Sequence, residues 1–249
     1  MNSSLANSDR SFYSNADLQY CVLPGKYLSQ IHRQLYAEIF KFWHKSWSRT
    51  FSEIELPFAA TSEEFCRHEE VTCLTYKGFV IACALVDYFD ISNPVQQNHS
   101  YFANYPVDVL KKVNLASKNL PVFTFGYLAI DPDFRKQHAL ADLIVGLAVR
   151  RIQESANPLM ITYTRNSRKT NDLGYRLGAH VLASNLVVRG ESSDFIYFDT
   201  ASMQTILHNE SYSIMQKLWD EKIYVPSLNV IEKTKEGKTY EENRFDRSL

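Results

Sequence analysis

The stretch from Val122 to Glu154 limits most strongly what this chain can fold into. Residues Val122 to Ile130 are rich in β-branched and aromatic side chains, which favours a strand. Asp131-Pro132 ends that strand, because proline lacks a backbone donor and the pair favours a turn. From Arg135 to Glu154 apolar residues recur every three or four positions, which predicts a helix with one apolar face. A strand followed by such a helix predicts a sheet with helices packed on its faces.

A hairpin is the second clear pattern. Val71–Tyr76 and Phe79–Tyr88 are β-rich runs separated by Lys77-Gly78, a typical turn. The further elements expected are strands at Leu18–Leu23 and Leu159–Thr164, helices at Tyr27–Trp47, Val107–Val113, Lys169–Leu177 and Ala201–Leu218, and a hairpin at Val181–Arg189 and Phe195–Asp199. This order predicts an α/β (α+β) fold with a mixed, mostly antiparallel central sheet and flanking helices, and it argues against a doubly wound nucleotide-binding fold.

The length of 249 residues suits one domain with short extensions. We expect a flexible N-terminal arm at 1–16, a single domain at 17–220 and a charged C-terminal extension at 221–249. The first twenty residues lack the apolar segment of a signal peptide, and no apolar run is long enough to span a membrane. A cytoplasmic protein is therefore the expectation, and the net charge of −1 gives no indication of a nucleic-acid partner.

Several side chains have an ordinary structural explanation. The four cysteines show no C-x-x-C pair and no zinc-like spacing, so we expect buried thiols and no metal site; they are Cys21, Cys66, Cys73 and Cys83. Trp43 and Trp47 are expected in the core, and Arg150 and Arg151 on a solvated face.

The segment Gly126–Ile144 carries the strongest chemical signal. It predicts a strand, a turn, a basic loop and the start of a helix. A helix start offers unpaired N–H groups and a partial positive charge, which bind phosphate groups. Arg135 and Lys136 add charge at the same place. We therefore expect an anionic cofactor to bind here.

This segment resembles the donor-binding motif of the GNAT superfamily of N-acyltransferases, in which a phrase like L-x-V-x-P-x-x-R leads into a glycine-rich loop and a helix. Leu128, Ile130, Pro132, Phe134 and Arg135 match that phrase, whereas non-glycine residues occupy the usual glycine positions. The resemblance covers roughly residues 70–200. It implies a GNAT-like sheet with splayed central strands, here Val122–Ile130 and Leu159–Thr164. The donor-binding residues implied are Leu128, Ala129, Ile130, Arg135, Lys136, Gln137, His138, Ala139, Leu140 and Asn166.

A second stretch, Asn166–Gly178, resembles the closing helix of the same family. Leu173, Leu177 and Gly178 fall in register with the family pattern, while the tyrosine that often protonates the leaving thiolate falls one residue late, at Tyr175. The resemblance implies direct attack of an amine on a thioester. Tyr175, Glu70 and Tyr163 are the catalytic candidates, and Glu69, Asp87 and Tyr127 are other side chains able to act as the base.

The resemblance implies an acyl-CoA or an acyl carrier protein thioester as co-substrate and a small-molecule amine as acceptor. Branches of the family that lack the loop glycines include acyl-homoserine-lactone synthases and long-chain N-acyl amino acid synthases, which use acyl carrier protein. Residues 131–176 hold eight basic and five acidic side chains, a surplus of three, which favours an acidic partner. The aromatic-rich helix expected at Tyr27–Trp47 and the long insertion at Asp90–Val113 would suit a medium or long acyl group better than an acetyl group. The alternatives are an acetyl-CoA-dependent acetyltransferase and a non-catalytic binding module.

Overall fold

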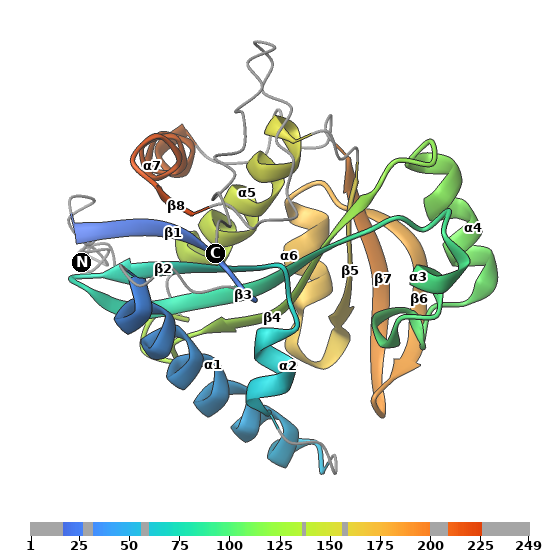
Figure 1. The fold of residues 1–249 in the computed structure, drawn as a ribbon, viewed down its shortest axis with the longest axis horizontal. Helices are drawn as coiled ribbons and strands as arrows, with labels where there is room; N and C mark the ends of the chain where they lie inside the picture. The colour runs from blue at the N-terminus through green and yellow to red at the C-terminus, as the bar shows by residue number, and fades with distance from the viewer. Residues whose placement is uncertain are drawn as a thin grey trace, which may run out of the picture.

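The structure is a computed structural model that describes residues 17–26, 32–55, 60–135, 138–155, 159–199 and 209–225. An eight-stranded mixed sheet runs through the molecule, in the order β6-β7-β5-β4-β3-β2-β1-β8 (Figure 1). The strands are β1 Leu18–Pro24, β2 Glu70–Tyr76, β3 Phe79–Phe89, β4 Val122–Ile130, β5 Leu159–Arg165, β6 His180–Val188, β7 Glu191–Asp199 and β8 Ile223–Tyr224. Within this sheet β4 and β5 pair in parallel, as do β1 and β8, and the other neighbours are antiparallel. The expected mixed, mostly antiparallel sheet is therefore confirmed.

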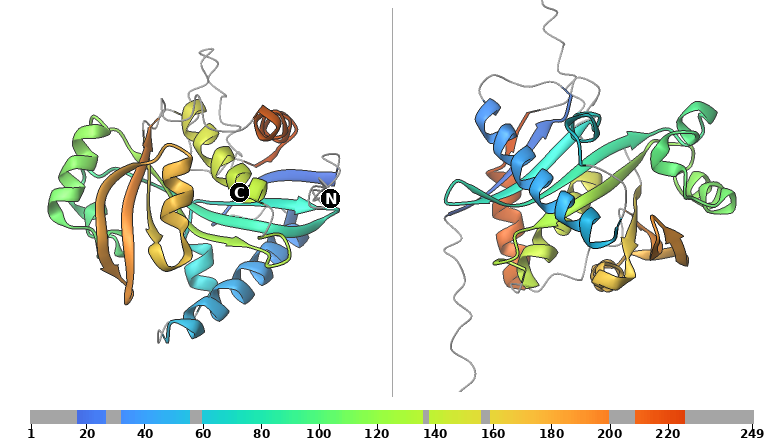
Figure 2. Two further views of the ribbon diagram at one scale, coloured as in Figure 1. Left: turned by 180° about the vertical axis from the view of Figure 1, so that it is seen from behind. Right: turned by 90° about the horizontal axis from the view of Figure 1, so that it is seen from below.

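Helices cover both faces of the sheet (Figure 2). They are α1 Arg33–Glu53, α2 Ser62–Cys66, α3 Pro94–Gln97, α4 Val107–Ala116, α5 His138–Glu154, α6 Thr170–Arg176 and α7 Asn209–Asp220, with 3-10 turns η3 Ser100–Phe102 and η4 Asn166–Arg168. Helices α1 and α2 lie on one face, and α5 and α7 lie on the other (Figure 1). In the described part of the chain, no helix combines the length and apolar composition that a membrane crossing requires.

Most of the expected elements are present, with shifted ends. The run predicted as a strand at Val122–Ile130 has those bounds in β4. The helix predicted at Tyr27–Trp47 is α1, Arg33–Glu53, and residues 27–31 lie outside the described residues. Its end is six residues later than predicted, because its apolar face continues to the buried Phe51. The expected helix at Ala201–Leu218 is α7, Asn209–Asp220, and residues 200–208 lie outside the described residues. The expected arm at 1–16 also lies outside them, while the expected C-terminal extension contributes β8, which pairs with β1.

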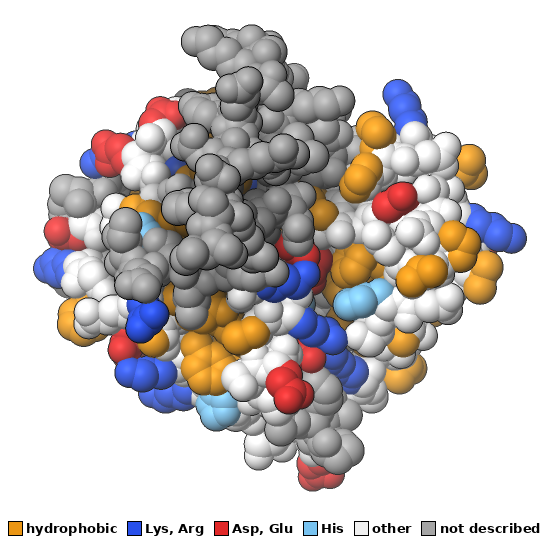
Figure 3. Space-filling model, viewed as in Figure 1, with side chains coloured by type: hydrophobic (Ala, Val, Ile, Leu, Met, Phe, Trp, Pro, Cys, Tyr) orange, Lys and Arg blue, Asp and Glu red, His pale blue; other side chains and the backbone are white. Residues whose placement is uncertain are grey.

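The segment between β3 and β4 forms a lobe of its own, made of α3, η3 and α4. Its buried side chains pack with Ile161, Val188 and Phe195 of the sheet, so the lobe covers the part of the sheet that lies beside β5 and β7. On the outside of the lobe Val95 and Leu115 are exposed, and Figure 3 shows hydrophobic side chains dispersed over this side of the molecule. The lobe therefore lengthens one wall beside the two central strands.

The two central strands separate along their length. β4 and β5 pair only at Phe123 with Met160 and at Thr124 with Ile161, near the start of each strand. Beyond these pairs, Phe125–Ile130 and Thr162–Arg165 are not paired with each other. The expected splaying of the central strands is confirmed, and it opens a gap in the middle of the sheet.

A β-bulge shapes β4 at this gap. Leu85 of β3 pairs with Gly126, whereas Cys83 pairs with Ala129, so two residues of β4 lie opposite one residue of β3. The first of the two, Tyr127, has φ 53°, a backbone conformation that residues other than glycine rarely adopt. Such strain persists only where the surroundings hold it, and it is often found at functional sites.

Two expectations about single side chains are wrong. Arg151 is not on a solvated face: it is 3% exposed, and its guanidinium donates to the buried Glu70 carboxylate at 3.0 Å and to the Tyr224 hydroxyl at 2.8 Å. The helical periodicity does not predict the burial of Arg151, because only apolar residues are expected to face a sheet. Arg151 faces it because its charge is paired with Glu70 of β2. Cys66 is exposed, whereas Cys21, Cys73 and Cys83 are buried free thiols as expected.

Candidate active site

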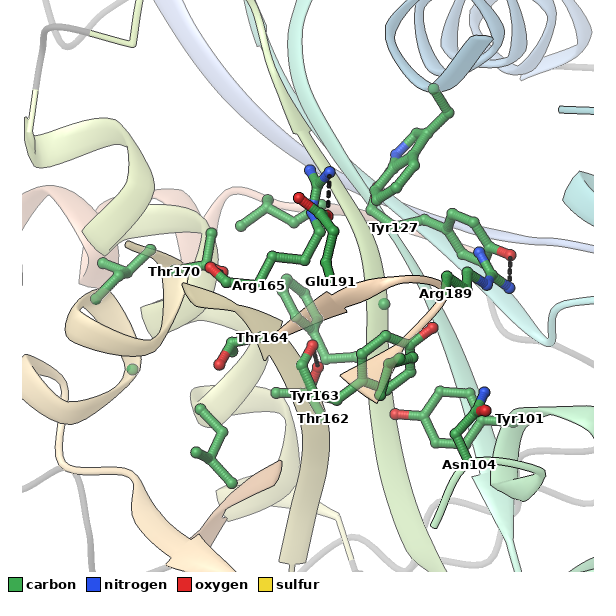
Figure 4. A pocket seen from close by; sticks show the side chains of 18 of the residues that line it. Tyr101, Asn104, Tyr127, Thr162, Tyr163, Thr164, Arg165, Thr170, Arg189 and Glu191 are labelled. Carbon is green, nitrogen blue, oxygen red and sulfur yellow. Dashed lines mark hydrogen bonds and ion pairs between the residues drawn. The ribbon is translucent and has the colours of Figure 1, made fainter. Parts of the chain in front are cut away.

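A cavity of about 300 Å³ occupies the gap between β4 and β5. It is lined by side chains from both faces of the sheet, so it passes through the sheet (Figure 4). Lining residues also come from α1, α2, the lobe, α5, α6 and the turn between β6 and β7. These segments are far apart in sequence, and the splaying of the two strands is what brings them around one space.

The wall on the side of α5 is apolar. Its residues belong to the core cluster that packs under α5 and α7; they are Phe125, Leu128, Val145, Met160, Leu173, Ile196 and Phe198. The few polar groups that line the cavity together with this wall are the threonine hydroxyls of Thr162, Thr164 and Thr170. Such a wall favours an aliphatic group over water.

Gly174 allows α6 to approach this wall closely. A Cβ added at Gly174 would lie 2.5 Å from Cδ1 of Ile196, well inside van der Waals contact. A side chain at position 174 would therefore require the end of the Ile196 side chain to move.

The wall on the side of α1 and the lobe is aromatic and charged. Three arginines and two glutamates line it, a surplus of one positive charge: Arg67, Arg165, Arg189, Glu64 and Glu191. The aromatic members are Trp47, Phe51, Tyr101, Tyr127 and Tyr163. The cavity thus has two chemically different ends, one suited to hydrocarbon and one suited to a polar, charged group.

The charges of this wall are ordered by hydrogen bonds and ring contacts. Arg165 donates to Glu191 at 3.3 Å, and its guanidinium lies 5.3 Å from the ring centre of Trp47. Arg189 donates to the Tyr127 hydroxyl at 3.2 Å (Figure 4). Burial opposes the charge of Arg189, but Tyr163 and Tyr127 favour it, and its pKa is raised. Both guanidiniums are therefore held as fixed positive charges.

Tyr127 connects several of these elements. Its carbonyl oxygen accepts a hydrogen bond from the Trp47 indole at 2.9 Å, and its hydroxyl donates to the carboxylate of Glu64. Burial is the largest effect that raises the pKa of Tyr127, and Glu64 acts in the same direction, whereas Arg189 opposes it. The hydroxyl therefore stays protonated and remains a donor.

Three arginines gather at the outer end of the gap. Arg135 follows β4 and donates its Nε–H to the carbonyl of Ile130 at 3.0 Å. Arg168 follows β5 and pairs with Glu53, which also lies 3.6 Å from Arg49. Burial, and then the positive charges of Arg49 and Arg168, lower the pKa of Arg135. In the described part of the chain no carboxylate forms an ion pair with Arg135, so this cluster fits an anionic ligand.

The expected donor-binding residues fall into three groups. Leu128 lines the cavity, Ala129 and Ile130 pair with β3, and Leu140 is a buried core residue of α5. Lys136 and Gln137 lie outside the described residues; His138 and Ala139 begin α5, and their side chains are not described. Asn166 does not line the cavity, and its amide donates to Asp194 at 3.0 Å and to Asn185 and Ser192 at 3.2 Å.

The three catalytic candidates do not lie together. Tyr163 lines the cavity. Tyr175 is not among the residues that line the cavity; its hydroxyl donates to Asp194, and burial, together with this bond, raises the pKa of Tyr175 to about 12. Glu70 is fully buried and paired with Arg151, on the other side of β3 from the gap.

Several residues of the site did not stand out in the sequence. Trp47, expected in the core, lines the cavity, whereas Trp43 is fully buried as expected. Glu64 follows Thr61 at the spacing of a helix capping box, a pattern that gives it an ordinary structural explanation. Arg189 sits in the β6–β7 turn, where a basic residue is unremarkable. No local signal shows that these side chains meet.

Comparison with known proteins supports the fold. No family model and no curated protein sequence matches the chain. Among solved structures, a CoA-dependent acyl-homoserine lactone synthase, BjaI, is similar with a TM-score of 0.51 at 9% identity, over 82% of this chain and 90% of that one. A polyamine N-acetyltransferase from Drosophila melanogaster, which forms N-acetylagmatine, gives 0.50 at 12% identity, over 74% of this chain and 100% of that one. The chain shares the architecture of these acyl-group transferases.

Proposed function

We propose that this chain, which has the fold of the GNAT superfamily, is an N-acyltransferase. It would move an acyl group from a phosphopantetheine thioester, carried by coenzyme A or by acyl carrier protein, to the amine of a small acceptor such as an amino acid. The observation that carries the proposal is the cavity between the unpaired parts of β4 and β5, apolar on one side and charged on the other.

The donor would enter along the gap. Arg135 and the helix start after it, with Arg49 and Arg168 nearby, offer positive charge to a phosphate. Beyond Thr124 the edge of β4 that faces β5 is no longer paired with it, and backbone groups there can hydrogen-bond the pantetheine arm and polarise the thioester carbonyl. The apolar wall with Phe125 and Met160 suits a medium or long acyl chain better than an acetyl group.

The acceptor would occupy the charged end. The surplus of one positive charge there favours an acceptor that carries an anionic group beside its amine, as an amino acid does. Holding amine and thioester in one cavity supplies the proximity that direct attack requires.

The proposal is tested by following thiol release from acyl-CoA and acyl carrier protein thioesters of increasing chain length against a panel of amines. Turnover that rises with chain length and with an amino acid acceptor is the expected result. Turnover with acetyl-CoA alone would favour the acetyltransferase alternative. Donor binding by calorimetry without thiol release would favour a binding module, and the absence of both would remove the proposal.

A further inference from the structure

Glu64 presents half of a buried carboxylate to the cavity. The residue is 9% exposed and its side chain lines the charged end. Its Oε1 atom accepts the Tyr127 hydroxyl and lies 2.7 Å from a guanidinium nitrogen of Arg67. Its Oε2 atom receives no hydrogen bond from any residue that the structure describes. One oxygen is therefore anchored, and the other is available to a ligand.

Glu64 does not make the helix-capping contact that its position in the sequence favours, and its buried carboxylate has to be stabilised by other residues. In a capping box the glutamate three residues after Thr61 returns to the backbone at the start of the helix. Here Thr61 Oγ1 accepts the Glu64 amide at 3.2 Å, but the carboxylate crosses to β4 instead. Burying a carboxylate is unfavourable unless it is paired. The strained Tyr127 and the ion pair with Arg67 supply that pairing on one oxygen only.

We propose that Glu64 is the catalytic residue that receives the acceptor's ammonium group and takes up one of its protons. This inference rests on the proposed function and assigns a base that the sequence left open. After Glu64 takes the proton, the neutral amine attacks the thioester carbonyl carbon. A C–N bond forms, the C–S bond breaks with its electron pair on sulfur, and the thiolate takes the second amine proton. Glu64 then releases its proton to water.

The charges around Glu64 agree with this role. The guanidinium of Arg67 lies beside the carboxylate, and the Tyr127 hydroxyl holds the orientation of its anchored oxygen. The charged and titratable groups that face this region are Arg67 and His68 after α2, Asp87 of β3, His99 before η3, Tyr127 of β4 and Arg189 of the β6–β7 turn. Burial, and then Arg67, lower the pKa of His99, so His99 adds little positive charge near neutral pH.

The test compares Glu64→Gln with Glu63→Gln, a neighbouring exposed glutamate that serves as the matched control. Donor binding is measured by calorimetry with a non-hydrolysable thioether analogue of acyl-CoA, and thiol release is measured with saturating amine from pH 6 to pH 10. At pH 7 we expect Glu64→Gln to lower kcat at least about 100-fold, with donor affinity within about twofold of the wild type. Glu63→Gln should match the wild type.

The dependence of kcat on pH distinguishes a role of Glu64 as the base from a purely structural role. A deprotonated amine needs no base, so the deficit of Glu64→Gln should shrink as the pH rises towards the pKa of the amine. A second variant, Glu64→Asp, keeps the carboxylate and should retain the wild-type shape of the pH profile at a lower kcat. A deficit that is constant at every pH, or full activity of Glu64→Gln, would overturn the role of Glu64 while the acyltransferase function stands. A wild type that neither binds the analogue nor releases thiol would instead overturn the proposed function.

Discussion

Trp47 donates its indole N–H to the carbonyl oxygen of Tyr127 at 2.9 Å, across 80 residues of sequence. This bond ties α1 to the bulge of β4, and the same tyrosine anchors Glu64. The conformation of the charged end of the cavity is therefore set partly by a bond between two of its own lining residues. By holding the strained backbone of Tyr127 in place, Trp47 can position the residues around it.

Trp47→Phe tests this tie. It keeps an aromatic ring but leaves the Tyr127 carbonyl without its donor, so we expect the free energy of unfolding to fall by about 1–2 kcal/mol. The KM for the acceptor should rise while donor affinity stays unchanged. Urea denaturation and steady-state kinetics measure the two effects. Trp43→Phe is the matched control, because the Trp43 indole nitrogen has no hydrogen-bond partner in the described part of the chain. It should leave the acceptor KM unchanged, and equal KM effects in the two variants would contradict the tie.

Arg135→Ala tests the arginine cluster at the outer end of the gap. Loss of a charged hydrogen bond to a phosphate should weaken coenzyme A binding by roughly 1.5–3 kcal/mol, which is about 10- to 150-fold in Kd. The loss should be smaller at high salt. Calorimetry with coenzyme A measures it, and Lys112→Ala, an exposed cation on α4, provides the control. An unchanged Kd for Arg135→Ala would exclude a phosphate contact.

Gly174→Ala tests the close approach of α6 to β7. The added methyl would meet Cδ1 of Ile196 at 2.5 Å, so we expect a loss of about 1–2 kcal/mol in the free energy of unfolding, although alanine favours a helix. Ile196→Val removes the colliding atom. The double variant should therefore be more stable than the sum of the two single effects predicts by about 1 kcal/mol, as measured by chemical denaturation. Strict additivity would show that the contact is not a constraint.

Asp194→Asn tests the polar network beside Tyr175. Burial alone would raise the pKa of Asp194, but hydrogen bonds from Tyr175, the Asn185 amide, Asn166 and Asn171 hold it below its ordinary value of 3.8. A lowered folded-state pKa stabilises the protein fully above the unfolded-state pKa, and this stability is lost as the pH falls below 3.8 towards the folded-state value.

Urea denaturation from pH 7 to pH 3 measures that effect. The wild type should lose stability in the acid range, whereas Asp194→Asn should be less stable at pH 7 and depend less on pH below about 4. Asp172→Asn, which changes an exposed carboxylate in the first turn of α6, should behave like the wild type. If the free energy of unfolding fell with pH equally steeply in the wild type and in Asp194→Asn below about pH 4, the prediction would be contradicted.

The fold could be predicted from the sequence to the extent that its signals are local. The bounds of β4 follow from a β-rich run and an Asp-Pro break, and the β2–β3 hairpin follows from Lys77-Gly78, where both residues have positive φ. At the C-terminal end of α1 the Ile54 amide bonds to the Ser52 carbonyl, a backbone cap without a side-chain signal, and there the prediction missed by six residues. Periodicity also predicted that Arg151 is exposed to solvent, because a charged residue is normally placed there. Its pairing with Glu70 in the interior depends on the tertiary fold and gives no local signal.

The candidate site was less predictable, because it depends on distances between segments that the sequence does not encode locally. The donor side, with Leu128 and Arg135, follows from one continuous stretch and could be identified. The charged end joins Trp47, Glu64 and Arg189, which are separated by up to 142 positions. These side chains meet only because β4 and β5 part after two paired positions.

The contact between Gly174 and Ile196 restricts how this molecule can change over time. A side chain at position 174 requires the end of the Ile196 side chain to move or to be shortened, so we expect substitutions at the two positions to be coupled. Variants with a larger residue at position 174 should therefore carry a shorter side chain at position 196 of β7 more often than other variants do. A search of natural variants for that paired exchange requires no knowledge of the substrate.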